Sequence, residues 1–325
     1  MKSATTLLND LSFQKTHTVD GRASIADLFR PPERCGIYVL HFANGEYYVG
    51  QAVDVTRRYV QHAKNHDDIV RISFKQVARY ELNEVEREAI STFETNGFLL
   101  RNISLTSIPK GESDFDLIMP PSQQEQWLSN SNYVDIEGRR IQDKDLRRKY
   151  YRRFQIFEQR PYAQEVISFL QDYVQVGIPA IKRGEVSFWS CSCLPGTNTS
   201  DSETKEVCAR VSIGWQEVLV ISLNNDGEIG YAWQVAKTPL QSKLNNLLHR
   251  IKWRKLRFID FSYPWGGADQ IRLETTGTGS ARMVIRDREI QKAIRLLNLR
   301  LMRKAPCIFG RYHCLDLADR ILAFG

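Results

Sequence analysis

Two short hydrophobic runs with a polar turn between them predict a β-hairpin near the start of the chain. Two short runs, Ile37–Phe42 and Tyr47–Val49, are rich in β-branched and aromatic residues, and Asn44 and Gly45 lie between them. An Asn-Gly pair between two such runs is the strongest short hairpin signal. We therefore predict two antiparallel strands joined at Asn44 and Gly45.

The length of this loop decides which faces of the sheet carry the tyrosines. A two-residue turn would place Tyr38 and Tyr48 on opposite faces, because side chains alternate along a strand. A three-residue loop, with Gly45 in the left-handed conformation and a bulge beside it, shifts the register by one residue. Tyr38 would then face Gly50 and Tyr48 would face Leu40. An active site that uses both tyrosines requires this second arrangement.

The pattern around the hairpin predicts a small sheet of about three antiparallel strands flanked by helices. Asp54 suits the N-cap of a helix that runs to about Asn65, and residues 68–74 are rich in β-branched residues that favour a third strand. From Leu82 a second helix follows. Its apolar stripe consists of Leu82, Ala89, Ile90 and Phe93, and Glu86 falls on the same stripe. A helical turn or two at residues 24–29 ends before two prolines, and this N-terminal arm is suited to covering a sheet edge.

The remaining two thirds of the chain predict a second α+β domain. A segment rich in Pro, Ser and Gly covers residues 106–131, a basic helical run follows at 139–153, and a more apolar helix at 162–176. We expect strands at 186–189, 208–213, 218–223 and 258–261. Near the end, Ile290, Ile294, Leu297 and Leu301 have helical spacing, and the basic residues Arg288, Lys292, Arg295 and Arg303 fall largely off that stripe.

Length and composition indicate how the chain divides into domains and which kind of partner it binds. A chain of 325 residues is longer than single cores usually grow, so we expect an arm at 1–30, a domain at 31–106, a linker at 107–138 and a domain at 139–325. The net charge of +7 favours a polyanionic partner. No apolar run approaches the ~18 residues of a membrane span, and the cysteines are irregularly placed, so we expect a cytoplasmic protein. The sequence does not indicate an oligomeric state.

The hairpin carries a set of residues with a recognisable spacing. The chain has Gly36-Ile37-Tyr38 in the first strand and Tyr48-Val49-Gly50 in the second, followed by Arg58, His62, Glu86 and Asn102. Over the first third of the chain this pattern resembles the GIY-YIG nuclease superfamily, with Val49 in place of the isoleucine of the family name. The later domain resembles no family that we recognise.

The resemblance implies a metal-dependent hydrolysis of phosphodiester bonds. Glu86 would hold one divalent ion, Mg²⁺ or Mn²⁺, and Arg58 would bind the scissile phosphate. Either Tyr38 or Tyr48 would orient the attacking water or accept its proton. His62 would position a tyrosine or relay its proton, and Asn102 would anchor the site by hydrogen bonding.

Each of these residues also has an ordinary structural interpretation. The tyrosines are typical sheet aromatics, Arg58 and His62 are typical of a helix surface, and Glu86 is suited to a capping box with Asn83. Glu84 and Glu88 are alternative carboxylates, and Arg57 is the alternative to Arg58. The match of all positions in order around an Asn-Gly hairpin favours the nuclease interpretation.

The second domain offers basic residues and cysteines. We expect DNA contacts from two basic tracts, with Arg147, Arg148 and Arg152 in the first and Arg250, Lys252, Arg254, Lys255 and Arg257 in the second. Cys191, Cys193, Cys208 and the pair His313 and Cys314 lack the paired spacing of zinc ligands, so buried free thiols are the favoured interpretation.

The functional hypothesis is a metal-dependent DNA endonuclease whose C-terminal domain recognises the substrate. It covers restriction, mobile-element or defence enzymes that read a sequence, and repair enzymes that read DNA structure. RNA is the second choice of nucleic acid. The alternative is a nucleic-acid-binding protein with a nuclease-like fold that does not cut.

Overall fold

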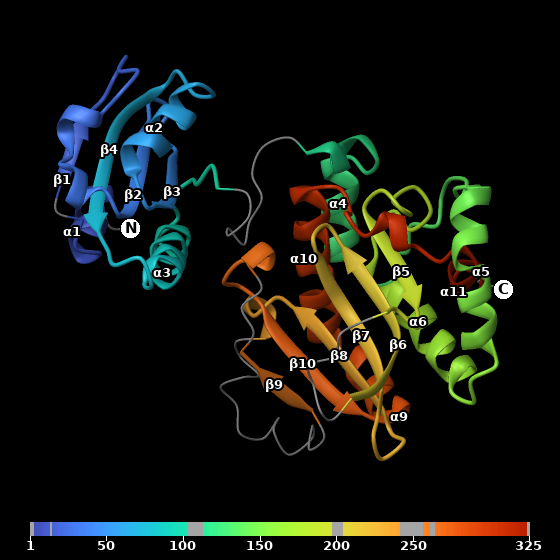
Figure 1. The fold of residues 1–325 in the computed structure, drawn as a ribbon. Helices are drawn as coiled ribbons and strands as arrows, with labels where there is room; N and C mark the ends of the chain where they lie inside the picture. The colour runs from blue at the N-terminus through green and yellow to red at the C-terminus, as the bar shows by residue number, and fades with distance from the viewer. Residues whose placement is uncertain are drawn as a thin grey trace. The chain divides into compact units, whose positions relative to one another are not determined.

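The protein consists of two α+β units. The computed structural model describes residues 3–13, 15–102, 113–196, 204–240, 256–260 and 264–323. Contacts divide the chain into a smaller unit, Met1–Lys110, and a larger unit, Gly111–Gly325. In the described residues the smaller unit has a four-stranded antiparallel sheet and the larger unit a six-stranded one, and nine α-helices accompany them (Figure 1).

The smaller unit contains the predicted hairpin and two predicted helices. Its elements are α1 (Ala4–Asp10), β1 (Lys15–Thr18), the 3₁₀ turns Ala26–Leu28 and Pro31–Glu33, β2 (Gly36–Phe42), β3 (Tyr47–Ala52), α2 (Val55–Ala63), β4 (Ile69–Gln76) and α3 (Leu82–Thr95). The strand order is β1-β4-β2-β3, so β1 adds a fourth strand at one edge of the sheet. The N-terminal arm therefore pairs with the sheet as an edge strand.

The hairpin loop between β2 and β3 has three residues, Ala43, Asn44 and Gly45, because Phe42 and Glu46 are still hydrogen-bonded across the hairpin. The Phe42 amide donates to the Glu46 carbonyl at 3.0 Å, and the Gly45 amide donates to the Phe42 carbonyl at 3.0 Å. Gly45 has φ +82°, a conformation that glycine adopts without steric penalty. In the resulting register Tyr38 lies opposite Gly50, and Leu40 lies opposite Tyr48. The bulged arrangement required by a shared tyrosine face is confirmed.

The two faces of this sheet pack against different helices. Tyr38 and Leu40 share a cluster with Val55 and Tyr59 of α2, whereas Ile37 and Val39 pack with the apolar stripe of α3. Helix α2 begins where predicted, because the Asp54 carboxylate accepts from the amides of Thr56 at 3.0 Å and Arg57 at 3.4 Å.

The larger unit has its six strands on one side of a helical layer. Its elements are a 3₁₀ turn (Asp114–Leu117), α4 (Pro121–Ser129), α5 (Lys144–Glu158), α6 (Ala163–Gly177), β5 (Trp189–Cys193), β6 (Thr204–Ile213), β7 (Gln216–Asn224), β8 (Ile229–Val235), the 3₁₀ turn Thr238–Leu240, β9 (Arg257–Ile259), the 3₁₀ turn Pro264–Gly266, β10 (Ile271–Thr276), α9 (Thr278–Ile285), α10 (Arg288–Lys304), the 3₁₀ turn Gly310–Tyr312 and α11 (Leu315–Ile321). The strand order is β5-β6-β7-β8-β10-β9, and α6 and α10 pack behind the sheet (Figure 1).

The segment expected to be a linker belongs partly to this core. Phe115, Met119 and Trp127 are completely buried in the main cluster of the larger unit. The expectation of a linker through residue 138 is therefore wrong for the described part of that segment, residues 113–138. The cause is that three large apolar side chains are spaced too widely among polar residues to form a periodic pattern.

Arg295 explains how this segment is held. Expected beside the apolar stripe of α10, it is instead only 1% exposed. Its guanidinium donates at 2.6–3.2 Å to a set of five backbone carbonyls, those of Trp127, Asn130, Ser131, Tyr133 and Val176. The sequence pattern placed Arg295 off the apolar stripe, and the structure shows that it is buried and joins several backbone segments.

One expected strand was partly wrong, and two strands of the larger unit were not predicted. Of the strand expected at residues 186–189, residues 186–188 are not extended, since Val186 has φ +67° and β5 begins only at Trp189. Strands β8 and β10 lacked a sequence prediction, although both pair over their full length. Gly230 and Gln234 in β8, and the charged residues of β10, weaken the strand signal there.

Replacing Gly45 tests the loop that sets the register. Gly45→Ala should lower the free energy of unfolding of the smaller unit by about 1 kcal/mol, because a left-handed residue with a Cβ is strained. Pulse proteolysis in urea, following cleavage within residues 1–102, measures this change. Gly45→Asn is the matched control and should lose less, since asparagine tolerates positive φ. An alanine variant as stable as the wild type would contradict the assigned loop conformation.

Candidate active site

Two tyrosines and a histidine form an aromatic cluster on the α2 face of the small sheet. The rings of Tyr38 and Tyr48 are stacked, with centroids 6.1 Å apart. The His62 ring lies 4.6 Å from Tyr48 and 5.7 Å from Tyr38, centroid to centroid. The register of the hairpin and the helical position of His62 therefore bring three of the predicted residues together.

A hydrogen bond joins two members of this cluster. The Tyr38 hydroxyl oxygen lies 2.8 Å from His62 Nε2. Burial, and then the charge of Arg58, lower the pKa of His62 to about 4, so the imidazole is neutral at pH 7. Burial, and then the neighbouring Tyr48, raise the pKa of the Tyr38 hydroxyl far above its ordinary value. A neutral imidazole next to a protonated phenol can accept its hydrogen bond.

Gly50 makes room for both tyrosines. A Cβ at this position would lie 2.5 Å from the Tyr38 hydroxyl oxygen and 2.8 Å from Cε1 of Tyr48. Such distances are far below van der Waals contact, so only glycine permits this approach. The glycine of the second tripeptide therefore has a steric role in the site.

Arg58 provides the positive charge beside the cluster. It lies on α2 four residues before His62, which places both on one face of the helix. Its Nη1 donates to Gln61 at 2.9 Å, and the Tyr38 hydroxyl raises the pKa of the guanidinium. The alternative, Arg57, has a side chain 87% exposed and lies 3.7 Å from Asp54. Of the two arginines, Arg58 is the one that interacts with the tyrosines.

Glu86 lies on the other side of strand β3. Its side chain is buried against the sheet, with 8% exposed, whereas Glu84 and Glu88 are exposed. Gln51 donates to Glu86 Oε2 at 3.0 Å and to Asn83 at 2.7 Å. The alternative interpretation of Glu86, a capping box with Asn83, does not apply, because the N-cap of α3 is Glu81 and Glu81 makes no side-chain cap.

The Glu86 charge still influences the tyrosine cluster. Burial raises the pKa of the Glu86 carboxyl, and the charge of Arg58 acts in the opposite direction. In turn, Glu86 contributes to the raised pKa of Tyr38. β3 is the edge strand of the sheet. Only this strand therefore lies between the Glu86 carboxylate and the tyrosine side chains.

Asn102 fixes strand β3 from its free edge. The Tyr47 amide donates to the Leu99 carbonyl at 2.8 Å, and the Arg101 amide donates to the Tyr47 carbonyl at 2.7 Å. The Asn102 side chain then accepts from the Val49 amide at 2.9 Å and donates to the Val49 carbonyl at 2.5 Å. These two hydrogen bonds position the strand that carries Tyr48.

The residues present suit a single hard cation at Glu86. The described part of the chain contains no group of three or more His, Cys, Asp or Glu that could hold a metal ion. Glu86 is a nearly buried carboxylate, and no described lysine or arginine nitrogen lies within ion-pair distance of it. Mg²⁺ is often bound through one or two carboxylates together with water and phosphate, so one such ligand is sufficient.

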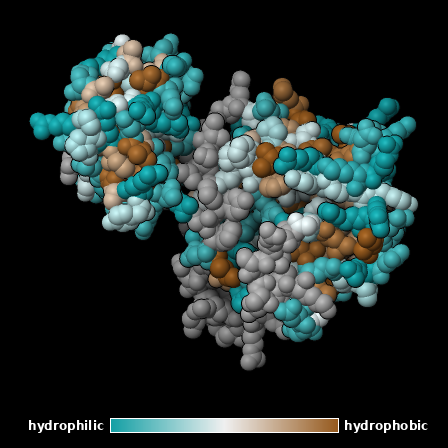
Figure 2. All heavy atoms as spheres, in the orientation of Figure 1, coloured by the Kyte–Doolittle hydropathy of each residue, from teal (hydrophilic) through white to brown (hydrophobic). Residues whose placement is uncertain are grey.

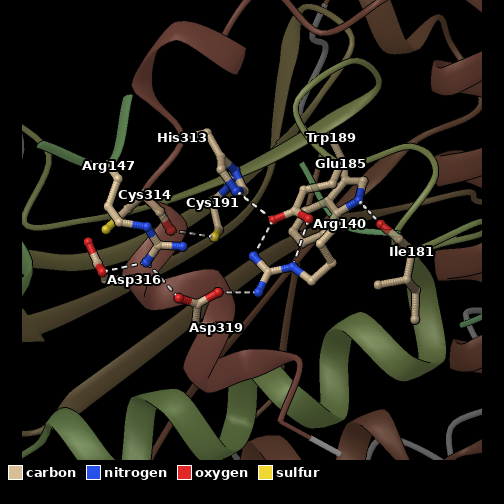
Figure 3. Close-up of polar contacts among 10 residues, drawn as sticks. All are labelled: Arg140, Arg147, Ile181, Glu185, Trp189, Cys191, His313, Cys314, Asp316 and Asp319. Carbon is tan, nitrogen blue, oxygen red and sulfur yellow. Dashed lines mark hydrogen bonds and ion pairs between the residues drawn. The ribbon is translucent and has the colours of Figure 1, made fainter. Parts of the chain in front are cut away.

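A second cluster of polar residues, in the larger unit, is structural (Figure 3). The completely buried Glu185 accepts from Arg140 at 2.6 and 2.8 Å and pairs with His313 Nε2 at 3.0 Å. His313 Nδ1 accepts from the Cys191 amide at 3.1 Å. Both ring nitrogens are therefore occupied, and neither can activate a thiol. The described cysteines, including Cys191, are free, and four of them are buried, as expected.

The same cluster contains Arg147, one of the predicted DNA contacts. Arg147 donates to Asp316 at 2.7 Å and to Asp319 at 2.6 Å, and Arg140 also bonds to Asp319 (Figure 3). This double ion pair holds α5 to α11, so Arg147 already has acidic partners.

The other predicted DNA contacts differ in their surroundings. Arg148 and Arg152 are exposed on α5. Arg257 is exposed but pairs with Glu274 at 2.7 Å. Arg250, Lys252, Arg254 and Lys255 lie outside the described residues.

Comparisons with known proteins add no assignment. No family model, curated protein sequence or solved structure matches this chain. None of the described helices is long and apolar enough to cross a membrane. On the face shown in Figure 2 both units are mostly hydrophilic, with small hydrophobic patches.

Acidification should weaken the tyrosine cluster. The pKa values of His41 and His62 are both lowered to about 4, mainly by burial, whereas histidine in an unfolded chain has a pKa near 6.5. Between these values the unfolded state binds more protons, so stability is full above pH ~6.5 and falls as pH decreases toward 4. Native-state hydrogen exchange of the β2 amides, converted to opening free energies at each pH, measures this slope.

Substituting His62 provides the control for that experiment. His62→Gln retains a hydrogen-bonding group but cannot titrate, so its opening free energies should depend less on pH. An identical slope in wild type and variant would contradict a buried neutral His62.

Proposed function

We propose that this protein is a divalent-metal-dependent DNA endonuclease that cuts with its smaller unit. The observation that carries the proposal is the convergence of Tyr38, Tyr48 and His62 on one face, next to Arg58, with a buried carboxylate at Glu86 across the edge strand. The order and spacing of these residues resemble the GIY-YIG nuclease superfamily. The geometry supports that resemblance independently, since a two-residue turn would have separated the tyrosines.

Arg58 is suited to binding the scissile phosphate. Its guanidinium is exposed on α2 and directed toward the tyrosine hydroxyls, so a phosphate there would replace the weak contact with Gln61. A planar guanidinium can donate two parallel hydrogen bonds to phosphate oxygens. These bonds strengthen as negative charge develops on the phosphoryl group.

The tyrosines are suited to orienting a water molecule for in-line attack. As the water oxygen bonds to phosphorus, it loses a proton and the bond to the leaving oxygen breaks. The Tyr38 hydroxyl can accept a hydrogen bond from this water while donating its own proton to His62 Nε2, 2.8 Å away. Tyr48 stacks against both partners and limits their motion.

Glu86 is the proposed ligand of the cation. Bound Mg²⁺ or Mn²⁺ would supply charge neutralisation at the phosphate and lower the pKa of a coordinated water. The raised pKa of Glu86 means that an adjacent cation would also stabilise its ionised form.

DNA is the proposed substrate because of the net charge and the exposed basic residues. The chain carries +7, and Arg148 and Arg152 are exposed on α5 of the larger unit. The proposal includes both sequence-reading and structure-reading enzymes. The alternative function, DNA binding without cleavage, is separated from it by the following experiments.

Glu86→Gln should abolish cleavage while leaving DNA binding intact. Glutamine retains an acceptor for Gln51 but removes the charge that holds a cation. We expect the cleavage rate of plasmid DNA with Mg²⁺ to fall at least a hundredfold, about 2.7 kcal/mol in activation free energy. Glu84→Gln and Glu88→Gln remove the same charge from exposed positions of α3 and should cut normally. No cleavage by the wild type on duplex, nicked, flapped or single-stranded DNA would favour the binding protein.

Arg58→Lys should reduce cleavage by about tenfold or more. Lysine keeps the charge but loses the forked contact, and one hydrogen bond to a charged group contributes ~1.5–3 kcal/mol. Single-turnover rates at saturating enzyme measure the effect on the chemical step. Arg57→Lys, at the neighbouring exposed position, is the matched control. Equal rates in the two variants would exclude Arg58 as the phosphate ligand.

A further inference from the structure

A cavity in the larger unit has the chemistry of an anion site. It lies between α5, the first two strands of the six-stranded sheet and the turn Gly310–Tyr312, and its volume is about 420 Å³. This volume is within the range of ~300–1,000 Å³ that is typical of small-ligand sites. All of its lining residues lie in the larger unit, so an assignment here does not depend on catalysis by the smaller unit.

The sheet presents hydroxyl groups to this cavity. Ser190 lies opposite Ser212, and Ser192 lies opposite Arg210, so these four side chains share one face of the β5–β6 pair. The intervening residues, such as Cys191, point into the apolar core. Ser190 and Ser212 are only 4% and 6% exposed. Buried hydroxyls that line a cavity are suited to hydrogen bonding a polar ligand.

Positive charge dominates the lining. Lys149 and Arg153 lie one turn apart on α5, and Arg210 projects from β6. Among the described lining residues the one carboxylate, Glu217, is hydrogen-bonded to Arg210. Among the described residues neither Lys149 nor Arg153 has a carboxylate within ion-pair distance. The excess of two positive charges matches a phosphate group.

One nitrogen of Arg210 strengthens this assignment. Its Nε is buried and has no hydrogen-bond partner among the described residues. A buried donor left without a partner costs about 1–3 kcal/mol. The ion pair with Glu217 therefore leaves the Arg210 guanidinium incompletely hydrogen-bonded at the inner wall of the cavity.

Aromatic rings line the remaining wall. Lys149 Nζ lies 5.3 Å from the ring centroid of Tyr150 and 6.0 Å from that of Tyr312, and Phe309 lies beside them. The Tyr150 hydroxyl donates to the Arg311 carbonyl at 2.9 Å, which fixes this ring. Tyr312 is 44% exposed at the mouth of the cavity. Exposed aromatic rings next to cations are suited to stacking on nucleobases.

We propose that this cavity binds a nucleotide through its phosphate. Lys149 and Arg153 hold the phosphate, the Arg210 guanidinium adds positive charge at the inner wall, and Tyr312 stacks on the base. The phosphate belongs either to a free mononucleotide or to a nucleotide at the 5′ end of DNA. The shared chemistry is a phosphomonoester attached to a nucleoside.

Calorimetric titration of the full-length protein tests the proposal. Thymidine 5′-monophosphate should bind at least tenfold more tightly than thymidine and than inorganic phosphate. Lys149→Gln/Arg153→Gln should lose this affinity at least tenfold. Arg139→Gln/Lys144→Gln removes the same charge from exposed positions of the larger unit outside the cavity and should bind the nucleotide normally. Tyr312→Leu should bind inorganic phosphate as the wild type does but lose the preference for the nucleotide.

A second titration distinguishes a free mononucleotide from a nucleotide at the 5′ end of DNA as the source of the phosphate. If the mononucleotide does not bind, an oligonucleotide with a 5′ phosphate should bind more tightly than the same strand with a 5′ hydroxyl. That difference should vanish in Lys149→Gln/Arg153→Gln, which would assign the cavity to DNA ends. The proposal is overturned if neither probe shows a phosphate-dependent affinity, if inorganic phosphate binds as tightly as the nucleotide, or if the control variant loses nucleotide binding equally.

Discussion

The register between β2 and β3 is the constraint on which the smaller unit depends. Side chains alternate between the faces of a sheet, so a slip of one residue would move Tyr38 to the α3 side and would move Ile37 and Val39 to the α2 side, out of the clusters in which they pack. Two independent requirements select the same register. The three-residue loop at Gly45 sets this register locally. The burial of Ile37 and Val39 against α3 stabilises the same register through tertiary packing. Agreement between local and tertiary preferences is what lets a short hairpin hold side chains in a fixed geometry.

In the larger unit the corresponding constraint is the pairing of two buried charged residues, Glu185 and Arg295. Burial works against ionisation of Glu185, but hydrogen bonds from Arg140 and His313 outweigh it and lower the pKa of its carboxyl. Burial lowers the pKa of Arg295 to about 10, which still leaves it charged at neutral pH, and carbonyl oxygens satisfy its donors. Removing one partner of such a group leaves an uncompensated charge in the interior, which costs several kcal/mol. Glu185 and Arg295 therefore restrict the positions of segments that are distant in the sequence more than apolar contacts do.

Short-range signals predicted much of the smaller unit, and long-range contacts account for what they missed. The Asn-Gly hairpin, the Asp54 N-cap and the α3 stripe are local, and all appear in the structure close to their predicted bounds. The roles of Arg147 and Arg295 depend on partners more than 100 residues away in the chain, so a basic run could not distinguish them from surface charges. The cavity beside Lys149 and Arg153 was missed for the same reason. The alternation of serine with cysteine at residues 190–193 is the one signal that pointed to a polar face on β5.

The electrostatics of the proposed active site imply that its two ligands assist each other. In the free protein Tyr38 and Glu86 both have raised pKa values and His62 is neutral, so Arg58 is the main fixed charge near the tyrosines. A phosphodiester bound to Arg58 alone would add negative charge and make Tyr38 and Glu86 still harder to ionise. A cation at Glu86 has the opposite effect on both groups. By linkage, each ligand must then increase the affinity of the site for the other, and the hydroxyl of Tyr38 is prepared for proton transfer only when both are present. A site with these properties would remain inactive toward DNA until the cation is bound, although the residues that hold the phosphate are already in place.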